Sequence, residues 1–256
     1  MNPDLELALE LCDVADAMTL RRFRDRNLVV HTKPDLTPVT QADRDVEVAL
    51  RNLLAKARPG HSVLGEELGP RDAEGSEWRW LVDPIDGTKN YVRGIPVFAT
   101  LLALQHRSDT VLGVVSAPAL DRRWWAARGE GACAGGEPAR VSEVGDLADA
   151  LLSYDDVVAF DTQGLARPFI DLARRCWRAR SYSDFWGHML VAEGAADVAL
   201  QAEPDAKIWD LAPLQVIVEE AGGRFSDLAG NARPDGGTAV STNGVLHDEV
   251  LAALYL

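Results

Sequence analysis

The sequence has 256 residues, of which 26 are basic and 40 are acidic, so its formal net charge is -14 at pH 7. A chain this acidic is a poor candidate for nucleic-acid binding, because phosphate backbones are bound by clusters of Lys and Arg. The apolar content is ordinary for a globular protein, and no apolar run approaches the roughly 18 residues that a membrane span needs.

The cysteines and the first residues of the chain bear on its cellular location. Cys12, Cys133 and Cys176 are scattered and lack CxxC spacing, which argues against a disulfide framework and against a thiolate metal site. The N-terminal residues include Asp4 and Glu6 and show no basic segment followed by an apolar one, so no secretion signal is evident. These features predict a cytoplasmic protein without a membrane partner.

In the first half of the chain, helical spacing of apolar residues gives way to short apolar runs. The spacing predicts helices over residues 4–26 and 42–57, with a polar, proline-containing loop at residues 31–38 between them. The later runs, which are separated by glycine, favour an antiparallel meander. The predicted strands lie at residues 62–65, 78–82, 97–105, 110–116, 123–127 and 131–133.

In the second half, helical and strand-like segments alternate without a flexible linker. Strands are predicted at residues 150–154 and 197–201, and Gly222 and Gly223 favour a C-cap at the end of the last predicted helix. The predicted helices lie at residues 164–176, 185–193 and 211–221. The whole pattern predicts an α/β protein with helices and sheets in stacked layers.

The segment 83–88, Asp-Pro-Ile-Asp-Gly-Thr, combines features of a metal site and an anion site. A strand delivers Asp83 to a sheet edge, Pro84 is expected to fix a turn, and Asp86 follows three residues later. Carboxylates suit a hard divalent cation. If a helix or turn begins at Gly87 and Thr88, their backbone N–H groups form an anion site. Taken alone, the segment is equally compatible with an Asx-turn and a helix cap.

Three further carboxylates lie at the ends of predicted elements. Glu66 follows a strand, Asp43 lies at the start of a helix, and Asp210 directly precedes one. Singly, Asp43 and Asp210 are typical N-caps, and Glu66 is a typical surface acid. Together with Asp83 and Asp86 they predict a divalent-metal cluster, because buried carboxylates without a cation repel one another.

Four linked segments resemble the inositol monophosphatase family. They are residues 37–43 (Thr-Pro-Val-Thr-Gln-Ala-Asp), 65–67 (Gly-Glu-Glu), 83–90 (Asp-Pro-Ile-Asp-Gly-Thr-Lys-Asn), and 209–210 (Trp-Asp) followed by 220–223 (Glu-Ala-Gly-Gly). They occur in the family's order and at comparable spacing, and the resemblance covers essentially the whole chain. It implies alternating layers of helices and sheets, and a homodimer.

The resemblance also implies a role for each candidate residue. Glu66, Asp83 and the carbonyl of Ile85 would hold a first Mg²⁺, and Asp83 would bridge to a second ion held by Asp86 and Asp210. Glu66 would also reach a third, weaker ion, so two or three Mg²⁺ ions are expected.

The implied reaction is phosphomonoester hydrolysis by metal-activated water. Thr88 and Asp43 would orient and deprotonate this water, with Glu66 completing the catalytic set. The backbone amides of Gly87 and Thr88 would bind phosphate oxygens.

The resemblance implies a site between two lobes of a single phosphatase domain. The lobe of residues 1–140 would carry most of the metal ligands, and the smaller lobe of residues 141–256 would carry Asp210 and the substrate-recognition residues. The loop at residues 31–38, with Lys33 and Asp35, resembles the family's mobile flap, although Lys33 is equally compatible with an ordinary surface position.

Substrate choice is expected to depend on Asp184, Phe185 and Glu203. An Asp with a nearby Glu suits a cationic leaving group through charge-assisted hydrogen bonds, and an aromatic ring can pack on a flat one. The run at residues 181–188 resembles the histidinol-phosphatase branch of the family, which implies L-histidinol phosphate as substrate.

Several alternatives stay open at the level of sequence. Phe185 is equally compatible with a core position in a helix, His188 with a buried structural histidine, and Asp184 with an N-cap. The substrate could be an inositol or sugar phosphate instead. A bisphosphatase is disfavoured because no cluster of Lys and Arg surrounds Glu203. A non-catalytic metal-binding protein on the same fold is the alternative of another class.

Overall fold

The computed structural model describes residues 2–32 and 38–255. The helices of this part are α1 (Pro3–Arg22), α2 (Gln41–Ala57), α3 (Thr88–Arg93), α4 (Val157–Thr162), α5 (Ala166–Arg175), α6 (Asp184–Ala192), α7 (Ile208–Glu220) and α8 (His247–Leu254), with short 3-10 turns η1 (Pro118–Leu120) and η2 (Leu147–Asp149). The strands are β1 (Val30–Thr32), β2 (Pro38–Thr40), β3 (Ser62–Gly65), β4 (Gly69–Arg71), β5 (Trp78–Asp86), β6 (Ala99–His106), β7 (Asp109–Ala117), β8 (Arg122–Ala127), β9 (Gly131–Ala134), β10 (Glu137–Ala139), β11 (Leu151–Tyr154), β12 (Arg178–Arg180), β13 (Val198–Gln201), β14 (Arg224–Ser226) and β15 (Ala239–Thr242).

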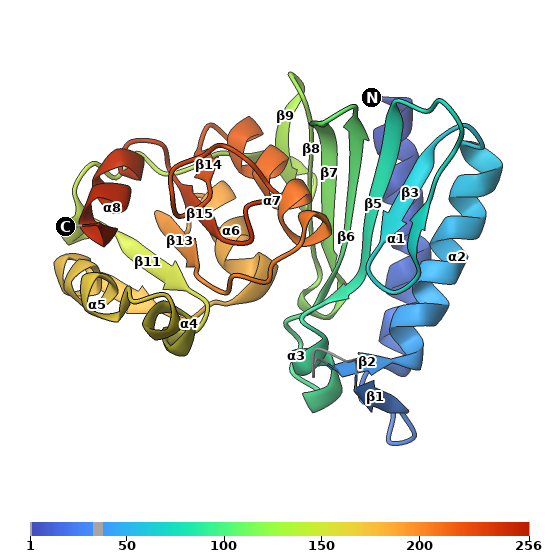
Figure 1. The fold of residues 1–256 in the computed structure, drawn as a ribbon, viewed down its shortest axis with the longest axis horizontal. Coiled ribbons are helices and arrows are strands. Elements are labelled where there is room, and N and C mark those ends of the chain that lie inside the picture. The colour runs from blue at the N-terminus through green and yellow to red at the C-terminus, as the bar shows by residue number, and fades with distance from the viewer. Residues whose placement is uncertain (1, 33–37, 256) are drawn as a thin grey trace.

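Helices and sheets alternate in layers, as Figure 1 shows. Helices α1 and α2 cover one face of an eight-stranded sheet with the strand order β10-β9-β8-β7-β6-β5-β3-β4. Helices α6 and α7 fill the space between this sheet and a five-stranded sheet with the order β12-β11-β13-β15-β14. Helices α4, α5 and α8 lie at the opposite end of the molecule from α1 and α2. The predicted α/β layering is confirmed.

The first helix packs an apolar face against α2 and the sheet. The Asn2 side chain caps it by accepting a hydrogen bond from the Asp4 N–H at 2.9 Å. Buried positions recur at the helical spacing; they are Leu5, Ala8, Leu11, Cys12, Ala15 and Thr19. The helix ends at Arg22, not at the predicted residue 26. Beyond it Arg24 takes a left-handed φ of 62°, and its Nε donates to the Gly94 carbonyl at 3.1 Å.

One parallel strand pair explains why two carboxylates meet at one edge of the eight-stranded sheet. Strand β3 runs parallel to β5 with Gly65 opposite Val82, whereas the other pairs in this sheet are antiparallel. The Glu66 N–H donates to the Val82 carbonyl at 3.1 Å. Glu66, which directly follows β3, and Asp83, which lies within β5, are therefore placed side by side. The predicted meander corresponds to β6–β9, which pair in chain order.

Strand β5 continues four residues beyond its predicted end. Its pairing with β6 shifts register between Asp83 and Asp86, which is the signature of a β-bulge. The expectation that Pro84 fixes a turn is therefore wrong: Pro84 lies within the strand, and its carbonyl accepts a hydrogen bond from Thr100 Oγ1 at 2.8 Å. The bulge changes the spacing of the two aspartates along the sheet edge.

The second half of the chain contains the predicted elements and several short ones that were not predicted. Predicted strands correspond to β11 and β13, and predicted helices to α5, α6 and α7. Helix α7 ends with the C-cap Ala221, followed by Gly222 at φ 93°, as expected for a glycine-terminated helix. The elements missed were α4, α8, β12, β14 and β15.

The division into lobes at residue 140 stays a prediction, although the eight-stranded sheet uses residues 62–139 and the five-stranded sheet residues 151–242. Of the predicted loop at residues 31–38, Lys33 and Asp35 lie outside the described residues; its flanks pair as β1 and β2. Among the described helices, none is long and apolar enough to cross a membrane.

Candidate active site

Four carboxylates, which we call the carboxylate cluster, lie where β3, β5 and α7 meet. Asp83 is only 2% exposed, and the carboxylates of Glu66 and Asp210 lie near enough for their charges to raise its pKa. Asp83 Oδ1 also accepts a hydrogen bond from the Ile85 N–H at 3.0 Å. Asp86 is the fourth member of the cluster. Its charge is the third-largest cause of the raised pKa of Asp83, after burial and the charge of Glu66. The structure thus brings together side chains 144 residues apart in sequence, from Glu66 to Asp210.

Helix α7 and a buried glutamate place two members of the cluster. Asp210 lies at the third position of α7, where its Oδ2 accepts the Lys207 N–H at 2.7 Å in a capping box. It is therefore not an N-cap residue, but its capping bond still fixes it at the helix start. The fully buried Glu47 accepts hydrogen bonds from the N–H groups of Glu67 and Leu68 at 2.7 and 3.2 Å, which holds the turn that carries Glu66.

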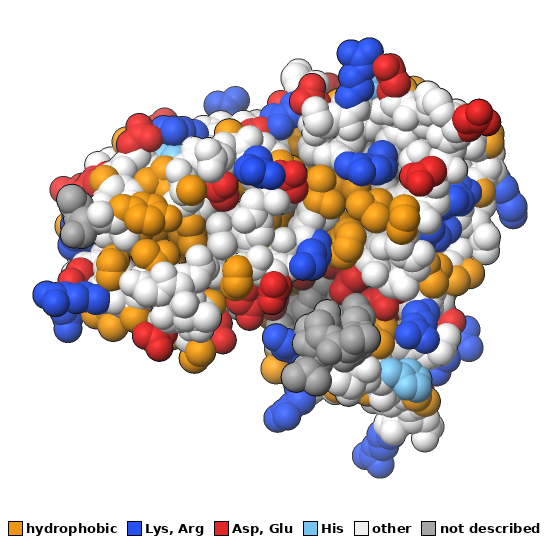
Figure 2. Space-filling view, viewed as in Figure 1, with side chains coloured by type: hydrophobic (Ala, Val, Ile, Leu, Met, Phe, Trp, Pro, Cys, Tyr) orange, Lys and Arg blue, Asp and Glu red, His pale blue; other side chains and the backbone are white. Residues whose placement is uncertain are grey.

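The electrostatics of the cluster are those of carboxylates in need of a counter-charge. Burial, then Glu66, Asp86 and Asp210, raises the pKa of Asp83 well above its usual range. Burial, followed by the charges of Asp184 and Asp210, does the same for Asp86, and burial raises the pKa of Asp210 to about 7. Figure 2 shows acidic side chains gathered in the hollow between the two halves of the molecule. Without a cation the cluster cannot hold its full negative charge at neutral pH.

Among residues 2–32 and 38–255, no three His, Cys, Asp or Glu side chains are arranged to hold a metal ion as they stand. The donor chemistry nevertheless fits a hard divalent cation, which takes carboxylate and carbonyl oxygens. The cluster offers four carboxylates, and the Ile85 carbonyl beside it accepts a hydrogen bond from Thr88 Oγ1 at 2.9 Å. The raised pKa values of Asp83, Asp86 and Asp210 are the observation that favours such an ion.

Asp43 and Thr88 form a second arrangement beside the cluster. Asp43 is fully buried at the third position of α2, and its Oδ2 accepts hydrogen bonds from Thr40 N–H at 2.8 Å and Thr40 Oγ1 at 2.5 Å. Its other oxygen, Oδ1, faces the Thr88 hydroxyl at 3.4 Å. Burial raises the pKa of Asp43, the hydrogen bonds from Thr40 oppose this, and Glu66 adds to it. Thr40, not Asp43, is therefore the N-cap of α2; Asp43 completes the capping box and also contacts Thr88.

Gly87 sits at the N-cap of α3 with a left-handed φ of 77°. A Cβ at this position would lie 2.9 Å from the Val97 carbonyl oxygen, so both conformation and space favour glycine. None of the described side chains caps α3, and Thr88 is its first residue. The predicted start of a helix at this point is present, although α3 is only six residues long.

Asp184 and Glu203, which we call the recognition pair, lie beside the cluster. Asp184 opens α6 with a left-handed φ of 56°, and its Oδ2 accepts a hydrogen bond from Asn90 Nδ2 at 2.9 Å. The next N–H, that of Phe185, donates to Asp86 Oδ2 at 3.1 Å. Burial raises the pKa of Asp184, and the exposed Glu203 is near enough to raise it further. The pair is thus linked to the cluster through Asp86 and Asn90.

The expected contact between Phe185 and a substrate ring is wrong. Phe185 is 1% exposed, and its ring lies in the core 6.1 Å from that of Trp124, so no substrate can pack on it. The alternative of a core position is the one observed. His188 is likewise buried, with Nδ1 2.7 Å from Ser241 Oγ, and burial lowers its pKa to about 4. Asp184 is not the N-cap of α6, because Ser183 holds that position.

Two residues that support the site received no role from the sequence. Asn90, which binds Asp184, lies within the segment 83–90 that carries the family resemblance, so the segment itself was a usable signal. Glu47 offered none, because a glutamate inside an amphipathic helix is normally exposed. Here it is paired with Arg51 Nε at 2.7 Å and with two backbone N–H groups.

Comparison with known proteins agrees with this geometry. The profile described as "Inositol monophosphatase family" matches residues 1–255. A histidinol-phosphatase of Mycobacterium tuberculosis is 53% identical, covering 99% of this chain and 98% of the relative. A histidinol-phosphatase of Streptomyces coelicolor is 48% identical, covering 98% and 96%. The crystal structure of extragenic suppressor protein suhB from Bartonella henselae matches with a TM-score of 0.90 and 29% identity, covering 98% of this chain and 97% of that one.

These matches, together with the carboxylate cluster, define a class of enzyme: the chain is a phosphoric monoester hydrolase that acts on a phosphate ester. It belongs to the inositol monophosphatase family.

Proposed function

We propose that this chain is a Mg²⁺-dependent histidinol-phosphatase, which hydrolyses L-histidinol phosphate to L-histidinol and phosphate in histidine biosynthesis. The main support is the 53% identity to a histidinol-phosphatase over nearly the full length of both chains. The recognition pair adds a chemical reason, because Asp184 and Glu203 bring two acids next to the cluster, where a cationic leaving group would lie.

The carboxylate cluster would hold the metal ions. Glu66, Asp83 and the Ile85 carbonyl would take one Mg²⁺, and Asp83, Asp86 and Asp210 a second, while Glu66 would also reach a third. When bound, the ions would supply the positive charge that an anionic phosphoryl transition state needs in so acidic a protein. The charges of Glu66 and Asp210 near Asp83 support the bridging position.

Asp43 and Thr88 would handle the attacking water. The Thr88 hydroxyl lies 3.4 Å from Asp43 Oδ1, so a water bound at Thr88 can pass its proton towards that carboxylate. The raised pKa of Asp43 makes this carboxylate a stronger proton acceptor than an ordinary exposed aspartate. The amides of Gly87 and Thr88 would bind phosphate oxygens, because the left-handed turn at Gly87 opens α3 without a side-chain cap among the described residues. Glu66 would complete the catalytic set.

The cationic end of the substrate would be bound by the recognition pair alone, since Phe185 lies in the core. Charge-assisted hydrogen bonds from an ammonium group to Asp184 and Glu203 would favour histidinol phosphate over neutral sugar or inositol phosphates. The two-lobed arrangement and a homodimer remain parts of the proposal that rest on the family resemblance, and a cytoplasmic location is a part that rests on the scattered cysteines.

The test is phosphate release from a panel of esters by purified protein with Mg²⁺. We expect the highest kcat/KM for L-histidinol phosphate, with inositol 1-phosphate and fructose 1,6-bisphosphate well below it. A rate on histidinol phosphate at least tenfold below that on inositol 1-phosphate would instead favour an inositol or sugar phosphatase.

Metal dependence is tested on the same protein after chelation. Activity should fall to background with EDTA and return with Mg²⁺. Full activity in metal-free protein would exclude the mechanism. Asp86 belongs to the cluster, so unchanged turnover in Asp86→Asn would mean that the measured activity does not depend on the cluster. That result would favour a non-catalytic metal-binding protein.

A further inference from the structure

The segment 202–204, which carries the exposed Glu203, belongs to the connection between β13 and α7 and is held by contacts from several elements. Asp155, which directly follows β11, makes the first of these contacts. Asp155 Oδ2 accepts hydrogen bonds from the N–H groups of Ala202 at 2.8 Å and Glu203 at 2.9 Å. The Asp155 N–H donates to the Leu200 carbonyl at 3.1 Å. One residue therefore fixes the backbone on both sides of the end of β13.

Two other elements hold the same segment. Gln163, which follows α4, donates from Nε2 to the Ala202 carbonyl. Gly237 packs so closely on the Pro204 carbonyl that a Cβ would collide with it. Residues 202–204 are thus held by groups from three separate parts of the five-stranded half of the molecule. The backbone from which the exposed Glu203 side chain leaves is therefore fixed.

Only one oxygen of the Asp155 carboxylate holds the segment 202–204. Its Oδ1 is buried and accepts no hydrogen bond from the described residues. A buried acceptor without a partner costs free energy. Burial also raises the pKa of Asp155 to about 6, against the hydrogen bonds from Glu203, Asp156 and Ala202.

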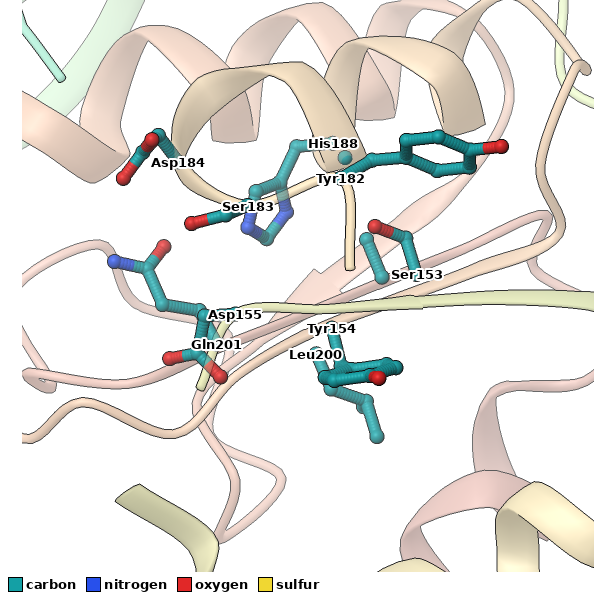
Figure 3. A pocket seen from close by; sticks show the side chains of 11 residues that line it. Ser153, Tyr154, Asp155, Tyr182, Ser183, Asp184, His188, Leu200 and Gln201 are labelled. Carbon is teal, nitrogen blue, oxygen red and sulfur yellow. The ribbon is translucent and has the colours of Figure 1, made fainter. Parts of the chain in front are cut away.

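The residues around Asp155 link it to the recognition pair. Figure 3 shows Asp155 and Asp184 lining the same pocket, together with Gln201 and Ser183. Glu203 raises the pKa of both Asp155 and Asp184, so its charge lies near each of them. The pocket itself has room for little more than a water molecule and is too small for the substrate. Asp155 is thus placed to act on the recognition pair without contacting the substrate.

We infer that Asp155 is a positioning residue that fixes the backbone of Glu203 near Asp184, and that it thereby sets the affinity for a cationic leaving group. This inference rests on the proposed function, since it deepens the role given there to Glu203. It predicts an effect on the discrimination between esters, while the carboxylate cluster and its chemistry stay intact.

The experiment compares Asp155→Ala, Asp155→Asn, Glu203→Ala and the double variant Asp155→Ala/Glu203→Ala as Mg²⁺-loaded proteins. Steady-state kinetics are measured with L-histidinol phosphate and with p-nitrophenyl phosphate, which has no cationic group. Asp161→Ala, an exposed substitution on neighbouring α4, is the matched control. Melting temperatures show whether each variant is folded.

We expect Asp155→Ala to raise KM for histidinol phosphate by about tenfold, the size of one charge-assisted contact, with kcat on p-nitrophenyl phosphate unchanged. Asp155→Asn should stay within about threefold of wild type, because the amide oxygen still accepts both N–H groups. The double variant should match Glu203→Ala, because a residue that acts only through Glu203 adds nothing once Glu203 is gone.

Three results would overturn the inference. The first is an unchanged KM in Asp155→Ala, and the second is additive effects on KM in the double variant. The third is an Asp155→Asn variant as impaired as Asp155→Ala, which would mean that the charge at position 155 acts directly. If Asp155→Ala does not fold, Gln163→Ala loosens the same segment from α4 and must show the same shift in KM. If wild type prefers another ester, the proposed function fails, and the inference is then decided by the same comparison on the preferred ester.

Discussion

The carboxylate cluster and the recognition pair lie side by side but are held by different kinds of structure. Glu66 directly follows β3, Asp83 lies within the paired strand β5, and Asp210 is fixed by a capping bond at the start of a helix. In contrast, Asp184 depends on a strained left-handed backbone, and Glu203 on the clamped segment 202–204. Under the proposed function, the regular elements would hold the group that acts on phosphate, which every substrate shares. The irregular ones would hold the group that meets the leaving alcohol, which differs between substrates.

This comparison separates two kinds of kinetic effect. Changes in the cluster should remove turnover on every ester, whereas changes in the recognition pair should alter the choice between esters. A variant that changes both the turnover on every ester and the choice between esters would weaken this separation.

The largest effect is expected from Asp83→Asn, which removes the bridging carboxylate but keeps its shape. We expect kcat to fall by about 10²–10³-fold on histidinol phosphate and on p-nitrophenyl phosphate alike. The stabilisation that Mg²⁺ gives the wild type in thermal melts should also be largely lost, because a ligand stabilises only the state it binds. Asp72→Asn, at an exposed position, is the control for a surface charge change. A variant that keeps wild-type turnover would remove Asp83 from the mechanism.

The second prediction concerns the backbone of the phosphate-binding turn. Gly87→Ala would add a Cβ 2.9 Å from the Val97 carbonyl and force an L-residue into φ 77°, at a strain of about 1–2 kcal/mol. Moving the Gly87 and Thr88 amides should lower kcat by about 10²-fold on all esters. Gly75→Ala is a matched control, because Gly75 has φ 68° but nothing within 4 Å of its added Cβ. Equal losses in both variants would mean that strain alone, and not the turn at position 87, is responsible.

A smaller and more selective effect is expected from Asp184→Asn. Asparagine tolerates the left-handed backbone at φ 56°, so this change removes the charge with little added strain. KM for histidinol phosphate should rise by about tenfold, and kcat/KM for p-nitrophenyl phosphate should change less than twofold. An equal loss on both esters would show that Asp184 acts through the cluster, with which it is linked by Asp86, and would merge the two regions.

Much of the cluster could be predicted from sequence because its members are local to recognisable elements. Asp83 and Asp86 occur in one short segment, and Glu66 and Asp210 lie next to clear apolar runs. The parallel pairing of β3 with β5, which brings two of them together, could not be derived from those runs. The bulge at Pro84 was also missed, because a proline after a strand normally indicates a turn.

The recognition region was harder to predict for a physical reason. Phe185 and Asp184 are adjacent in sequence, yet one side chain enters the core and the other contacts Asn90, and apolar periodicity alone does not resolve this. The short strands β14 and β15 gave no usable pattern, because the core that stabilises them is formed by distant residues. Asp155 is 48 residues from Glu203, and Gln163 is 39 residues from Ala202, yet both hold the segment 202–204.

The smallest effect on activity is expected for His188, which tests whether the core beneath α6 can change without altering recognition. Burial lowers its pKa from 6.5 to about 4, so between these values the unfolded chain binds a proton that the folded protein does not. The neutral imidazole therefore contributes stability that is fully present above pH 6.5 and is lost as the pH falls towards 4. The contribution is about 3 kcal/mol.

His188→Asn should accordingly flatten the fall in unfolding free energy between pH 6.5 and 4, as measured by urea denaturation in that range. His247→Asn is the matched control, because His247 is also buried, its pKa is also lowered to about 4, and it lies in α8, remote from the recognition pair. Both variants should flatten the profile to a similar extent and leave KM for histidinol phosphate within about twofold of wild type. A selective rise in KM for His188→Asn would show that recognition depends on the packing of α6, so that the recognition pair is held by the core as well as by irregular backbone.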